Sequence, residues 1–155
     1  MKLKLGQKNI LSMMTLILDT LLIYILLNKK LNSYDRILVY FVLVIHFVFY
    51  ISIYNDFSKL MEICHIAMPL VMLLSIFVKN IYLLGVIFIF IIMIFITWFI
   101  FDDCILKNDK EYIAIYIINK IKELIGIDFH NGYNIPKFFT IIFVIIIIKI
   151  IKILI

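Results

Sequence analysis

The sequence predicts an all-α integral membrane protein with four to five transmembrane helices and one interfacial amphipathic helix. The chain of 155 residues is 66% hydrophobic and only 16% charged, with a mean hydropathy of +1.18. A soluble domain would carry about 45–50% apolar and about 25% charged residues. Between residues 63 and 101, the only formal charge besides a protonated His65 is Lys79. Since a spanning helix needs roughly 20 apolar residues, this stretch contains two spans that fold back at Lys79.

Four long apolar runs define four helices in order along the chain. The first run is longer than the apolar core of a signal peptide, which has about 7–15 residues, and no small-residue cleavage site follows it, so we interpret it as a retained span. Pro69 interrupts the third run and is expected to bend that helix. The predicted spans are 10–27, 37–54, 60–78 and 81–101.

Two further helices are predicted after the fourth span. Segment 112–125 places Ile113, Ile117 and Ile121 on one stripe, a pattern typical of an amphipathic helix in the membrane interface. The last run, 138–155, is predicted as a fifth span whose lysines extend to the far headgroups. The alternative is a half-inserted or partner-packed helix, because about 11 uninterrupted apolar residues fall short of a full crossing. The whole chain forms one membrane domain, 1–155.

Four titratable residues lie within the predicted spans: Asp19, His46, Glu62 and His65. Such residues are costly in a bilayer and are functional candidates by default. Asp19 and His46 are equidistant from the middle of the first loop, and His46 and His65 from the middle of the second. Because each helix rises about 1.5 Å per residue, the hairpins bring all three to one level near the middle of the bilayer.

Three interpretations of this intramembrane cluster remain open. The spacing Glu62-x-x-His65 occurs in helical di-iron proteins, but those need two such motifs and two further glutamates, and this chain has one copy. A relay of protons or a polar substrate through the aspartate and the histidines is the second interpretation. The third is structural: Asp19 pairs with a histidine, and the buried contacts hold the first three spans in register. We favour the third and expect no cofactor.

Composition and charge bear on origin, partners and orientation. Isoleucine is abundant and Arg occurs only once, which indicates the AT-rich coding of a large DNA virus, an organelle or an AT-rich bacterium. The net charge of +5 comes from lysines that flank apolar runs, so we expect no nucleic-acid partner. Counting Lys and Arg on the two sides gives nine against six, which favours an N-terminus on the cytoplasmic, matrix or interior side.

The segment from Trp98 to Glu111 resembles a family of uncharacterised small polytopic helical membrane proteins, in which a Trp precedes a Cys-Pro-Leu-Thr motif and a Glu. Ile105 replaces the Pro, Lys107 replaces the Thr, and the spacing to the Glu is loose. The resemblance covers about a tenth of the chain and implies a helical membrane fold without naming an activity. The matching positions are Trp98, Cys104, Leu106 and Glu111.

No nucleophile elbow, phosphate loop or paired-cysteine motif is present in the sequence. We therefore expect a non-enzymatic subunit, structural or accessory, of a viral membrane or a multi-subunit membrane complex. Its partners would be the lipid bilayer, other membrane subunits or further copies of itself. The alternative is a small membrane enzyme or proton-coupled carrier that uses the intramembrane cluster.

Overall fold

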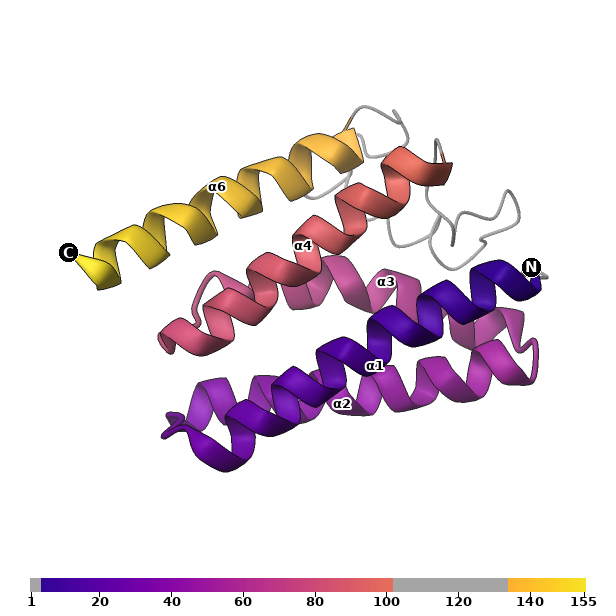
Figure 1. Ribbon diagram of the computed structural model, residues 1–155, viewed down its shortest axis with the longest axis horizontal. Helices are drawn as coiled ribbons and strands as arrows, with labels where there is room; N and C mark the ends of the chain where they lie inside the picture. The colour runs from indigo at the N-terminus through magenta and orange to yellow at the C-terminus, as the bar shows by residue number, and fades with distance from the viewer. Residues whose placement is uncertain (1–3, 102–133) are drawn as a thin grey trace, which may run out of the picture.

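The structure, a computed structural model, describes residues 4–101 and 134–155, and these residues form an all-α bundle (Figure 1). Four of its helices, α1 to α4, are long and apolar enough to cross a membrane. The predicted class of helical membrane protein is therefore confirmed. The helices are α1 (Leu5–Asn28), α2 (Ser33–Tyr54), α3 (Ser58–Ser75), α4 (Ile81–Phe101) and α6 (Asn134–Leu154).

The helix boundaries depart from the predicted ones where polar side chains extend or stop a helix. The second helix begins four residues earlier than predicted, because the Asn32 side chain accepts a hydrogen bond from the Asp35 amide at 2.8 Å and caps it. The third helix continues through Pro69 but ends at Ser75, three residues early, where the amides of Ile76 and Phe77 turn back to carbonyls three residues before them. The first helix begins five residues early and the last one four.

Helices α1, α2 and α3 follow one another as antiparallel neighbours, and α4 lies between α1 and α6 (Figure 1). Aromatic rings join α4 to α6: Phe88 stacks on Phe143 with centroids 5.1 Å apart, and Trp98 meets Phe139 at 5.4 Å. The helix predicted as a fifth span thus runs along α4, the arrangement expected of a crossing helix. Whether it crosses stays a prediction.

The buried side chains form two apolar clusters. The larger one joins all five helices through residues such as Leu22, Leu38, Met72, Ile91 and Ile146. The smaller one lies between α1, α2 and α3 near the α2–α3 turn and contains Leu11, Phe49, Ile53, Met61 and Cys64. Only 28–39% of each candidate span is buried, and large apolar side chains cover the outer faces. Such a surface requires lipid or partner helices around it.

The bundle has two ends, which we name by the terminus each carries. The N-terminal end holds the start of α1 and the α2–α3 turn, joined by an ion pair of 2.8 Å between Lys8 and Asp56. Asp56 adopts a φ of 54°, a left-handed conformation that Asp tolerates better than most residues. The C-terminal end holds the α1–α2 loop, the α3–α4 turn and the end of α6. The predicted interfacial helix 112–125, and Cys104, Leu106 and Glu111 of the resemblance, lie outside the described residues.

Candidate functional site: an intramembrane pair and a buried end junction

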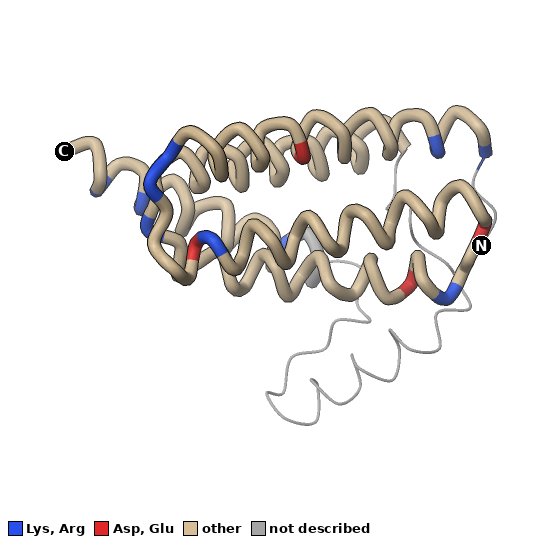
Figure 2. The backbone as a smooth tube through the Cα atoms, turned by 90° about the horizontal axis from the view of Figure 1, so that it is seen from below, with Lys and Arg blue, Asp and Glu red and all other residues tan. Residues whose placement is uncertain are grey.

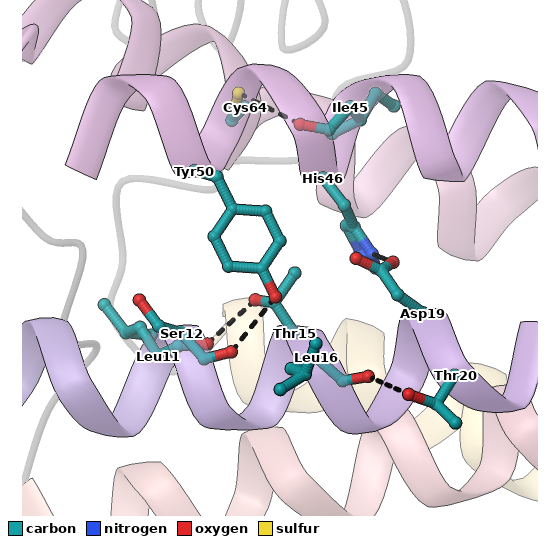
Figure 3. A network of polar contacts seen from close by, with 10 residues as sticks. All are labelled: Leu11, Ser12, Thr15, Leu16, Asp19, Thr20, Ile45, His46, Tyr50 and Cys64. Carbon is teal, nitrogen blue, oxygen red and sulfur yellow. Dashed lines mark hydrogen bonds and ion pairs between the residues drawn. The ribbon is translucent and has the colours of Figure 1, made fainter. Parts of the chain in front are cut away.

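Asp19 of α1 and His46 of α2 face each other across the helix contact, with 2.6 Å between Asp19 Oδ1 and His46 Nδ1 (Figure 3). An ionised carboxylate can only accept a hydrogen bond, so the ring donates from Nδ1. The two side chains are 17% and 12% exposed. On α1, Asp19 lies at the level of the larger apolar cluster, between Leu18 and Leu22. A carboxylate–imidazole pair in such a place can hold two helices together or pass a proton.

Further polar contacts lie beside this pair (Figure 3). The Tyr50 hydroxyl of α2 donates to the Ser12 carbonyl of α1 at 3.2 Å. On the other side of α2, the Cys64 thiol of α3 lies 3.8 Å from the Ile45 carbonyl. Because Ile45 and Cys64 directly precede His46 and His65 in the sequence, this contact places the two histidines at neighbouring levels. All three helices therefore meet in one polar layer.

The structure places the other two predicted site residues, Glu62 and His65, on α3 with half-buried side chains. A cluster of all four residues stays a prediction. Within residues 4–101 and 134–155, no group of three or more His, Cys, Asp and Glu side chains is arranged to hold a metal ion. The Glu-x-x-His spacing thus gains no further ligand from the described residues.

A second polar site, which the sequence analysis missed, is centred on Asp35 at the C-terminal end. Its side chain is fully buried. The carboxylate accepts hydrogen bonds from Asn32 Nδ2 at 2.8 Å, from the Lys79 amide at 3.3 Å and from the Asn80 amide at 3.0 Å. The carboxylate therefore joins the start of α2 to the α3–α4 turn. We call this contact set the end junction.

Asn80 and Lys149 complete the end junction. The Asn80 side chain caps α4, accepting from the amides of Tyr82 and Leu83, and donates to the Lys30 carbonyl at 3.3 Å. The Lys149 ammonium of α6 donates to the carbonyls of Ile76 and Val78. That Lys149 extends to the headgroups stays a prediction; its partners in the structure are carbonyls just beyond the end of α3, where the backbone of a helix end leaves acceptors unpaired.

The sequence contains a signal for the position of Asp35. Asn32 and Asp35 stand three residues apart, the spacing of a helix N-cap and the residue whose amide it accepts. With the second span placed at 37–54, both residues were assigned to a polar loop. Once α2 begins at Ser33, Asp35 falls in its first turn, where a carboxylate is favoured by the helix dipole.

Comparisons of this chain with protein-family models, with curated proteins and with solved structures found no match. The class rests on the fold and the polar contacts: in residues 4–101 and 134–155 this is a polytopic α-helical membrane protein with an ionisable pair, Asp19 and His46, inside the bundle and a buried carboxylate, Asp35, at its end.

Proposed function

We propose that this protein is a non-enzymatic integral membrane subunit, structural or accessory, of a viral membrane or a multi-subunit membrane complex. The observation that carries the proposal is the contact between Asp19 and His46, which binds α1 to α2 directly. Each of the two groups has its partner within the bundle, and a polar contact of this kind fixes the register of neighbouring helices in lipid. In this proposal the N-terminus lies on the cytoplasmic, matrix or interior side.

The outer faces of the helices support an assembly role. Phe47 of α2 is 65% exposed and Phe99 of α4 is 87% exposed. In a membrane these faces meet lipid, and they offer broad apolar surface to other membrane subunits or to further copies of the chain. The few glycines leave little room for the close helix contacts that sliding helices need, and this favours a static scaffold.

One observation favours the alternative, a small membrane enzyme or a proton-coupled carrier. Asp19 Oδ1 and His46 Nδ1 lie 2.6 Å apart, close enough for a proton to pass between the two side chains. Carboxylates and histidines inside membranes often carry protons in this way.

Substitution of the pair separates the two proposals. Full-length protein with Asp19→Asn or His46→Gln is reconstituted in lipid and compared with the unsubstituted protein for assembly size, thermal stability and proton flux. The structural proposal expects smaller assemblies or lower stability, with no proton flux in any sample. Proton flux in the unsubstituted protein that disappears in stable, normally assembled variants would establish the carrier. The matched control is Thr20→Val, an exposed polar residue beside Asp19 on α1 whose hydroxyl bonds only within its own helix.

A further inference from the structure

Among residues 4–101 and 134–155, charged side chains are distributed differently at the two ends of the bundle. Within the described residues, the N-terminal end has four cationic residues, Lys4, Lys8, Lys59 and Lys137, with two acidic ones, Asp56 and Glu62. The C-terminal end has a single acidic residue, Asp35, against a larger set of cations, which Figure 2 shows gathered there. These cations are Lys29, Lys30, Arg36, Lys79, Lys149 and Lys152.

The one acidic side chain described at the C-terminal end, Asp35, does not neutralise these cations at the surface. Asp35 is fully buried, and its oxygens accept from backbone and amide N–H groups of the end junction. Lys149 faces carbonyls, and Lys29 lies over the Tyr82 ring at 3.9 Å. Across residues 4–101 and 134–155, the four exposed cations of this end form no ion pair. They are Lys30, Arg36, Lys79 and Lys152.

An apolar groove begins at the same end, between α2 and α3. Its volume is about 220 Å³, and its lining is Tyr34, Ile37, Leu38, Phe41 and Leu74. At one edge of the groove, the Tyr34 hydroxyl of α2 donates to the Leu74 carbonyl of α3 at 2.6 Å. Phe77 lies edge-on to the Tyr34 ring. We call this edge the rim of the groove.

Two of the exposed cations belong to the segments that meet at this rim. Lys79 follows Phe77 by two residues, and its amide contacts the carboxylate of Asp35, the residue next to Tyr34. Lys30 lies nearby, since its carbonyl accepts from Asn80. Positive charge and the mouth of the groove therefore lie at one level of the bundle.

We propose that the C-terminal end binds an anionic phospholipid, with an acyl chain in the α2–α3 groove and the phosphate near Lys30 and Lys79. This ligand joins a negative head directly to a hydrocarbon chain, as the site joins cations to an apolar groove. An acidic protein segment fits less well, because its backbone N–H and C=O groups would lack partners in the groove. The proposal goes beyond the function proposed above and does not depend on it, since it concerns the isolated chain.

Lipid binding to the full-length protein in mild detergent tests this site. Native mass spectrometry compares phosphatidylglycerol with phosphatidylcholine of the same acyl chains. We expect tighter binding of phosphatidylglycerol. Each lysine near an anionic headgroup changes binding by roughly fivefold, so Lys30→Gln with Lys79→Gln should reduce the preference by about 25-fold. The matched control at the other end, Lys4→Gln with Lys59→Gln, should keep it.

A second pair of variants tests the groove itself. Ile37→Trp fills it with a large side chain and should lower the number of tightly bound lipids. Val44→Trp, at an equally exposed position of α2 outside the groove, should not. Equal binding of the two lipids by the unsubstituted protein would overturn the proposal and favour an acidic protein partner. Equal losses in the two double-lysine variants, or in the two tryptophan variants, would also overturn it.

Discussion

The intramembrane pair and the end junction show two ways in which this bundle keeps a carboxylate away from water. Asp19 pairs with the His46 ring of the neighbouring helix, and most of the surface of both side chains is covered. Asp35 is fully buried and is surrounded by N–H donors from the α1–α2 loop and the α3–α4 turn. The first contact joins two helices that are already adjacent in the chain. The second joins segments more than forty residues apart, so we expect it to contribute more to stability.

Substitution of Asp35 should have the largest effect. Asp35→Ala removes the acceptor of the Asn32 side-chain amide and of the Lys79 and Asn80 backbone amides, three part-buried donors that each cost about 1 kcal/mol, the lower end of the range for an unsatisfied group. We expect a loss of about 3 kcal/mol or more, measured by unfolding of the full chain in detergent. Asp35→Asn keeps one acceptor oxygen and should lose less. A smaller loss for Asp35→Ala than for substitution of His46 would reverse the comparison between the two sites.

Lys149 tests whether α6 belongs to the end junction. Lys149→Met keeps the length of the side chain but removes the donor to the Ile76 and Val78 carbonyls. Because the lysine is only half-buried, we expect a loss of about 1–2 kcal/mol, at the lower part of the range for hydrogen bonds to charged groups. Lys152→Met, one turn further along α6 and exposed, is the matched control and should change stability little.

The fluorescence of the single tryptophan, Trp98, reports whether α6 stays packed against α4. Trp98 packs edge-on against Phe139 of α6, so its fluorescence responds if α6 moves away from α4. We expect a red-shifted emission in Lys149→Met and none in Lys152→Met. An unchanged spectrum together with unchanged stability would show that aromatic packing alone holds α6 in place.

The comparison of the two sites also shows what the sequence could predict. Asp19 and His46 stand out because each interrupts a long apolar run, and hairpin symmetry places them at one depth. Asp35 lies among other polar residues, so hydropathy gives no reason to bury it. Its burial depends on the α3–α4 turn, which reaches it only when the bundle is assembled. The sequence does not predict the contact of Lys149 with the Ile76 and Val78 carbonyls either, because the ends of α3 and α6 come together only in the folded bundle.

The intramembrane pair itself should show the smallest effect, and a double-mutant cycle measures it. Asp19→Leu and His46→Leu each leave one polar group without its partner, whereas the double variant leaves neither. The double variant should therefore cost less than the sum of the single losses. Interhelical hydrogen bonds in membranes average about 0.6 kcal/mol, with a maximum near 1.7, because the unfolded chain in lipid also finds partners. We expect a coupling of about 1 kcal/mol.

The sign and size of this coupling free energy distinguish the two proposed roles of the Asp19–His46 pair. Coupling of about 1 kcal/mol with reduced assembly would mean that the contact holds α1 against α2, as proposed for a structural subunit. Additive losses would mean that the 2.6 Å contact contributes nothing beyond its separate groups. Asp19 and His46 would then be unfavourable in the bilayer without stabilising the contact between α1 and α2. The proton-carrying alternative would become the better explanation.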